Sequence, residues 1–176
     1  MASDLLLFQI SSVSALVGMT LGWRGVMTRY SGFYDLPTAW SNVFWGILLG
    51  GVYSSQIYTQ IIIPNIEFEV TNETVVNPIN LILLCLIASI LAHFILRRNR
   101  VRSGSSQTTS GWALGLAVGG MFGMVVIYAV LRLSEVNIPM MVTIILLAIL
   151  TPRCEAIISS YQGHLMLNGR KWGAIS

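Results

Sequence analysis

Residues 111–124 read GWALGLAVGGMFGM. Gly111, Gly115, Gly119 and Gly123 recur every four residues, so a helix carries all four along one face. Glycine costs a helix about 1 kcal/mol per residue in water, whereas in lipid a row of small residues lets two helix backbones approach closely. We therefore predict a membrane helix that packs tightly against a neighbour through this face, which we call the glycine ridge.

Two other apolar segments carry small residues at the same spacing. One contains Gly46 and Gly50, and the other contains Ser14, Gly18 and Gly22. We expect these glycines and the glycine ridge to hold several helices together within one chain. The alternative is that the glycine ridge faces a second subunit, which would make the protein a homo- or hetero-oligomer.

The composition indicates that lipid is the main solvent of the whole chain. Of its 176 residues, 55% are hydrophobic and only 10% are charged, against roughly 25% charged in soluble domains. These values exclude a soluble enzyme, a disordered tail and a cytosolic protein that binds nucleic acid. We predict an integral, multi-pass membrane protein with no nucleic-acid partner.

Five segments are apolar enough to cross a bilayer. A crossing takes about 20 residues, and nearly all of the five reach that length. The last of them is short and is expected to end before Pro152. The sequence thus predicts an all-α, polytopic transmembrane helix bundle of about five spans in a single domain. Residues 97–110 are expected to form a basic, Ser-rich cytoplasmic linker, and residues 153–176 a cytoplasmic tail at the membrane interface. The five spans are residues 5–23, 39–63, 79–96, 111–131 and 136–151.

Nine of the ten basic residues fall on one side of this five-span arrangement, and Arg132 is the exception. Because basic residues stay on the cytoplasmic side, we predict that the N-terminus lies outside and the C-terminus inside. Membrane lipids are expected partners, since the planar guanidinium group can donate two hydrogen bonds to a headgroup phosphate. The candidate headgroup contacts are Arg24, Arg29, Arg97, Arg98, Arg100 and Arg102.

The second segment is the most polar of the five, and Tyr53, Gln56 and Gln60 share one face of it. These side chains either bond neighbouring helices together or line a polar pathway for an uncharged or weakly polar solute. Apart from Tyr and Cys, His93 is the only titratable side chain well inside a segment, and its place near the inner surface indicates an interfacial histidine. So little buried charge argues against an ion-driven pump.

The chain contains no motif for a catalytic nucleophile, paired carboxylates, a phosphate-binding loop or zinc ligands. Cys85 and Cys154 stand alone, without metal-binding spacing. We expect no enzymatic activity, no metal and no cofactor. Asn72 begins a glycosylation sequon, whose use the sequence leaves open. Two hypotheses of function follow: a structural or accessory subunit of a membrane assembly held by small-residue helix packing, or a small transporter or channel component with a polar pathway along the second segment.

Overall fold

The computed structural model of the chain describes residues 3–27, 36–64, 78–133 and 137–169, and all of the secondary structure within them is helical. The predicted all-α class is confirmed. Arg29 and the sequon at Asn72 lie outside the described residues. The elements are α1 (Asp4–Met27), α2 (Leu36–Ile57), the π-helix η1 (Tyr58–Ile62), α4 (Pro78–Leu96), α5 (Asn99–Ser103), α6 (Gln107–Leu133) and α7 (Ile138–Leu167).

Four of the described helices, α1, α4, α6 and α7, are long and apolar enough to cross a membrane. They fit a multi-pass membrane protein. The helix that corresponds to the second predicted span, α2, is not among the four. It continues through η1 as one helical stretch to residue 64, but polar side chains such as Asn42, Ser54 and Gln56 make it less apolar than the others.

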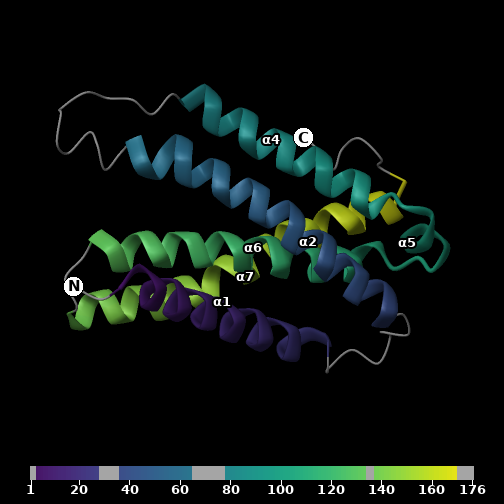
Figure 1. The fold of residues 1–176 in the computed structure, drawn as a ribbon. Coiled ribbons are helices and arrows are strands. Elements are labelled where there is room, and N and C mark those ends of the chain that lie inside the picture. Colours follow the sequence, from purple (N-terminus) through teal and green to yellow (C-terminus); the bar gives the residue numbers. More distant parts are fainter. Residues whose placement is uncertain (1–2, 28–35, 65–77, 134–136, 170–176) are drawn as a thin grey trace.

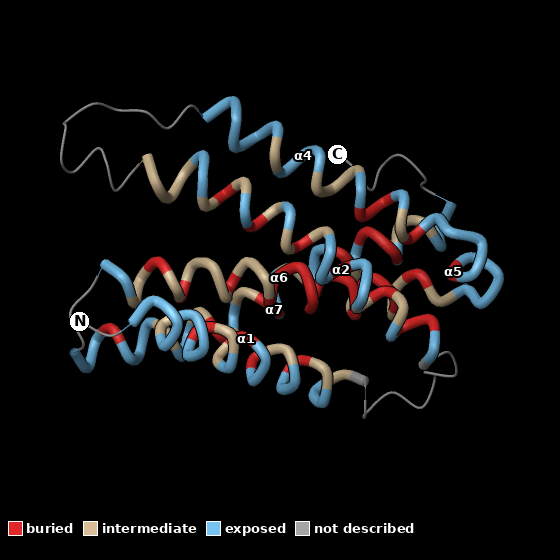
Figure 2. The backbone as a smooth tube through the Cα atoms, viewed as in Figure 1, coloured by how far each residue is buried: buried red, intermediate tan, exposed pale blue. Residues whose placement is uncertain are grey.

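Helix α6 lies at the centre of the fold, in contact with α1, α2 and α7, while α4 lies along α2 on the outside (Figure 1). In the most apolar window of α6, 56% of the residues are buried, against 17% or 22% in α1, α4 and α7. Buried positions accordingly concentrate on α6 in Figure 2, whereas α1 and α4 are exposed along much of their length. Because these outer helices expose large apolar side chains, they present the surface that lipid would cover.

The glycine ridge of α6 faces α7 of the same chain. A Cβ atom added to Gly119 would lie 2.5 Å from the carbonyl oxygen of Thr151, and one added to Gly115 would overlap the carbonyl oxygen of Glu155. The two helices are therefore in backbone contact, which only glycine permits. The remaining ridge residues also meet α7, Gly111 at Ser159 and Gly123 at Thr151.

The glycines of α1 and α2 lie at further helix contacts around α6. A Cβ atom on Gly46 would lie 2.6 Å from the carbonyl oxygen of Leu114, and one on Gly50 would lie 2.8 Å from the Cα atom of Val118. On the opposite side of α6, Gly22 meets the side chain of Leu116, and Gly18 meets the backbone of Ala148 in α7. All eight predicted packing glycines thus lie where two helices meet.

The predicted helix end before Pro152 is wrong, because α7 continues through this proline to Leu167. Proline leaves the carbonyl oxygen of the residue four positions earlier, Ala148, without its helical hydrogen bond. Membrane helices tolerate this because neighbouring groups compensate, and here Gly18 of α1 packs directly against that carbonyl. The consequence for function is that Glu155 lies inside a helix of the bundle and not in a tail.

Candidate functional site

A polar cavity of about 210 Å³ lies between α2, α4, α6 and α7. Its walls combine apolar side chains such as Leu49, Val118 and Ile158 with a set of groups that can donate or accept hydrogen bonds. We call this space the Glu155 cavity. Its polar lining residues are Tyr53, Cys85, Ser89, Glu155, Ser159 and Gln162.

Among the described residues, Glu155 supplies the only carboxylate of the cavity, and its backbone lies against the glycine ridge. The backbone of Glu155 abuts Gly115, and its Cβ atom would be 2.9 Å from a Cβ atom on Gly119. The side chain is half-buried. Counted from the start of α6, Gly115 lies roughly 12 Å along the helix axis, so the carboxylate is well inside the bundle.

Within the described residues there are only two acidic side chains, and Glu155 is the one inside the bundle. The other, Asp4, is exposed in the first turn of α1. No described basic residue forms an ion pair with Glu155, and no described residue forms a hydrogen bond with its carboxylate. A carboxylate in an apolar surrounding is costly unless it is neutralised or bonded, so the cavity is a place where a binding partner would lower the free energy.

The other polar walls come from α2 and α4. The Tyr53 hydroxyl lies 3.6 Å from the Cys85 sulfur, and the Tyr53 ring packs 6.1 Å from the ring of Phe122. From α7, Gln162 Nε2 donates to the backbone carbonyl of Ser89 at 3.2 Å. Tyr53 and Gln162 are thus both held against α4, and bonded groups form part of the cavity wall.

The structure brings only one of the three predicted pathway residues into this cavity. Tyr53 lines it, but Gln56 and Gln60 do not. Gln60 Nε2 donates to Gln56 Oε1 at 2.9 Å along the same stretch of helix. This bond joins the two amides to one another, and neither lines the cavity.

Sequence reasoning missed the residues that α7 contributes. Glu155, Ser159 and Gln162 follow one another at helical spacing, and they share one face because positions three and four apart are neighbours on a helix. The pattern was readable, but Pro152 was interpreted as a helix end. Glu155, which the prediction placed in a tail, therefore lies on a long helix of the bundle.

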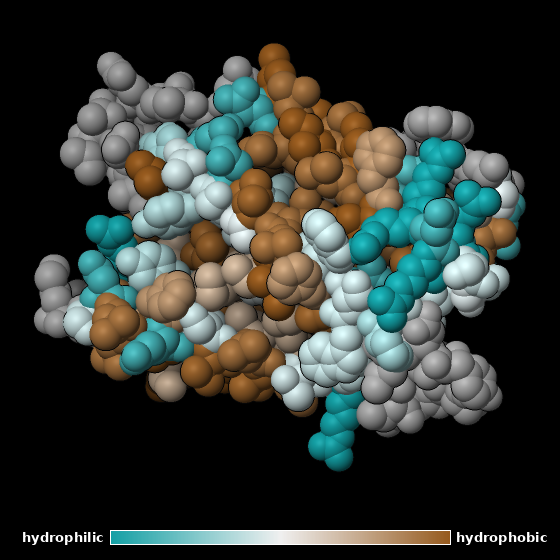
Figure 3. Space-filling model, turned by 45° about the vertical axis from the view of Figure 1, so that its right-hand side comes forward, coloured by the Kyte–Doolittle hydropathy of each residue, from teal (hydrophilic) through white to brown (hydrophobic). Residues whose placement is uncertain are grey.

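The described candidate headgroup contacts gather at one end of the bundle. Arg24 lies in the last turn of α1, and the other four surround the end of α4 and the short helix α5, namely Arg97, Arg98, Arg100 and Arg102. These elements lie at the same end of the molecule in Figure 1. In Figure 3, hydrophilic residues occupy both ends of the molecule and hydrophobic ones form the band between them. Arg132 lies at the opposite end, where it donates to the Tyr58 hydroxyl at 3.2 Å.

His93 lies near the arginine end of α4 and is buried. Together with Arg97, Arg102 and Gln107 it lines a small cavity of about 90 Å³. In the part of the chain that the structure describes, no three His, Cys, Asp or Glu side chains come together to hold a metal ion. Glu155 is accordingly not joined by further charged ligands.

Comparison of the chain with protein families, curated sequences and solved structures finds no match. The arguments about function therefore rest on the geometry of the Glu155 cavity. Chemically, that cavity offers one carboxylate together with a phenol, two serine hydroxyls and an amide. Such a set can bind a cation or a protonated amine through charge and hydrogen bonds.

Proposed function

We propose that this chain is a non-catalytic, multi-pass membrane protein that binds a small monovalent cation, either a protonated amine or an alkali-metal ion, and serves as a transporter or channel component. The observation that carries the proposal is the position of Glu155, a single carboxylate in a polar cavity enclosed by four helices. Ionisable groups inside a membrane bundle usually mark solute or ion pathways. The solute expected from the sequence was uncharged or weakly polar, and Glu155 changes that expectation to a cation.

The size and charge of the cavity support a small occupant. A space of about 210 Å³ corresponds to roughly seven water molecules at about 30 Å³ each. A single carboxylate balances one positive charge, which favours a monovalent cation over a divalent one. Hydroxyl and carbonyl oxygens around the carboxylate would complete the ligand shell.

The proposal includes five spans, with the stretch formed by α2 and η1 as the second of them. This stretch is long enough to cross a bilayer, since residues 36–64 at about 1.5 Å per residue exceed the roughly 30 Å of hydrocarbon. The N-terminus would lie outside and the C-terminus inside, because the end that carries Arg24 and the arginines of 97–102 would face the cytoplasm.

An accessory role in a membrane assembly is the second candidate. It is favoured by the wide apolar faces of α1 and α4, where large side chains such as Leu5, Val13 and Ile82 are exposed, because a partner helix covers such a face as well as lipid does. The glycine ridge is not free for that partner, since α7 occupies it. A second subunit would therefore contact an exposed apolar face, such as those of α1 and α4.

Thermal unfolding of the purified full-length protein in detergent tests the cation proposal. The probes are Na⁺, K⁺, methylammonium and choline as chlorides at constant ionic strength. A cation that binds the folded state at 100 times its Kd adds about 2.7 kcal/mol to stability, so at least one probe should raise Tm selectively.

The control variants separate binding at Glu155 from a general salt effect. Glu155→Gln keeps the shape of the side chain and removes the charge, so the selective rise in Tm should disappear. Asp4→Asn removes the other described carboxylate, which is exposed, and should keep the rise. Equal responses of the wild type and Glu155→Gln to every probe would overturn the proposal and favour the accessory role.

A further inference from the structure

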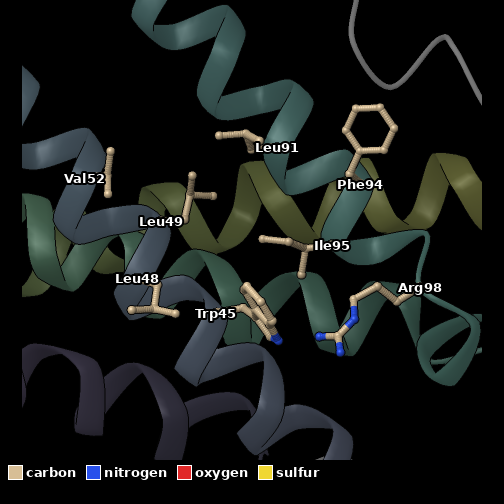
Figure 4. A pocket seen from close by; sticks show the side chains of 8 residues that line it. All are labelled: Trp45, Leu48, Leu49, Val52, Leu91, Phe94, Ile95 and Arg98. Atoms are coloured by element: carbon tan, nitrogen blue, oxygen red, sulfur yellow. The ribbon is translucent and has the colours of Figure 1, made fainter.

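A second cavity lies on the surface between α2 and α4, separate from the Glu155 cavity. It is a groove of about 430 Å³ with one charged group among its lining side chains. Figure 4 shows the side chains of the two helices facing this space, with the charged group at one end. The residues used below are Trp45, Leu48, Val52, Leu91, Phe94 and Arg98. We call this space the α2/α4 groove.

Most of the groove is apolar and open to the outside of the bundle. Four of its apolar side chains are 43% to 63% exposed, as lipid-facing side chains of membrane helices would be. They are Leu48, Val52, Leu91 and Phe94. From Trp45 to Val52 the groove follows α2 for roughly 10 Å. An aliphatic chain lying along this length would cover the exposed side chains without leaving a polar group unbonded.

The charged end of the groove is formed by Arg98 and Trp45. The guanidinium carbon of Arg98 lies 5.0 Å from the centre of the Trp45 ring, a cation–π contact that holds the charge beside the apolar lining. No described acidic side chain pairs with Arg98. The guanidinium hydrogens are therefore available to an anion at this position.

We propose that the α2/α4 groove binds one acyl chain of an anionic phospholipid, whose phosphate accepts hydrogen bonds from Arg98. Charge complementarity selects this occupant, because a phospholipid joins an aliphatic chain to an anion at one end, as the groove joins an aliphatic wall to a cation. Arg97, Arg100 and Arg102 increase the positive potential around the same end. Trp45 beside them suits the level of the headgroups.

Native mass spectrometry of the full-length protein in detergent tests this site. The probes are phosphatidylglycerol and diacylglycerol with identical acyl chains, so that only the first carries an anionic phosphate. A charge-assisted hydrogen bond contributes about 1.5–3 kcal/mol, which corresponds to at least a tenfold preference. The wild type should therefore bind phosphatidylglycerol at least about tenfold more tightly.

Two pairs of variants locate the binding. Arg98→Gln should remove most of the preference for phosphatidylglycerol, whereas Arg100→Gln, which lies outside the groove lining, should keep it. Val52→Trp fills the apolar part and should weaken binding of both lipids, whereas Ile145→Trp on the exposed face of α7 should not. An unchanged preference in Arg98→Gln, unchanged binding in Val52→Trp, or a copurifying membrane helix that excludes both lipids would overturn the proposal.

Discussion

The carbonyl oxygen of Glu155 occupies the space that a Cβ atom on Gly115 would need. One contact therefore connects the packing of α6 on α7 with the position of the carboxylate in the cavity. A larger residue at Gly115 would push α7 away from α6 and displace Glu155 from Tyr53 of α2. Stability and solute binding should thus depend on the same glycine.

Replacing Gly115 by Leu should destabilise the fold substantially. Overpacking a well-packed contact costs about 1–3 kcal/mol, and here the clash involves backbone that cannot rotate away. Thermal unfolding in detergent measures the change, and Gly115→Ala should already lower Tm. Gly25→Ala is the matched control, because a Cβ atom there meets nothing within 4 Å; equal Tm values for the two alanine variants would contradict the tight packing.

The same contact explains how far the sequence could predict the fold. The four-residue spacing of glycines predicted a close helix neighbour for α6, but spacing cannot identify which helix that neighbour is. The identity depends on α7 being long enough to reach from Gly123 to Gly111, and Pro152 concealed that length. A proline ends most helices, yet here the carbonyl of Ala148 packs on Gly18, a contact between residues far apart in the chain.

The candidate site was harder to predict than the helices for the same physical reason. Tyr53 was identified because it lies in a visibly polar segment. Glu155, Ser159 and Gln162 were assigned to a tail, where polar residues need no explanation. Periodicity assigns residues to a face of one helix, whereas the cavity arises from four helices whose arrangement depends on side-chain packing.

Gln162→Ala should loosen α4. The amide of Gln162 bonds the carbonyl of Ser89 and so joins α7 to α4, which otherwise lies on the outside of the bundle. Such interhelical hydrogen bonds contribute about 0.6 kcal/mol on average in membranes. Hydrogen exchange should therefore become faster around residues 85–96 of the variant, with only a small change in Tm.

Gln60→Ala is the control for this effect. Gln60 donates only to Gln56 on the same helical stretch, so its loss should leave exchange in α4 unchanged. Equal exchange rates in α4 for both variants would show that the Gln162 bond does not hold this helix.

The charge of Glu155 should control which reagents reach Cys85. Both line the same cavity, and Cys154→Ser leaves Cys85 as the single thiol. The ratio of modification rates for cationic and anionic methanethiosulfonates should fall by well over tenfold in Glu155→Gln. The carboxylate attracts the cationic reagent and repels the anionic one, and each effect is worth roughly 2 kcal/mol for charges about 8 Å apart at an effective dielectric of about 20. Asp4→Asn in the same Cys154→Ser background removes an exposed carboxylate and should leave the ratio at Cys85 unchanged, whereas an unchanged ratio in Glu155→Gln would argue against a shared cavity.

The number of spans determines whether Asp4 and Ser103 lie on the same side of the membrane. With α2 and η1 crossing, α1, α2 and α4 place these two residues on opposite sides. Without that crossing, α4 would enter from the other side and both residues would share one compartment.

The difference is measured by labelling right-side-out vesicles with an impermeant maleimide. The labelled variants are Asp4→Cys and Ser103→Cys, each made with Cys85→Ser and Cys154→Ser. We expect labelling at position 4 in intact vesicles and labelling at position 103 only after permeabilisation, since the arginines around α5 favour the cytoplasm. Labelling of both positions in intact vesicles would show that the second segment does not cross the membrane. Tyr53 in the Glu155 cavity would then not be embedded in the membrane.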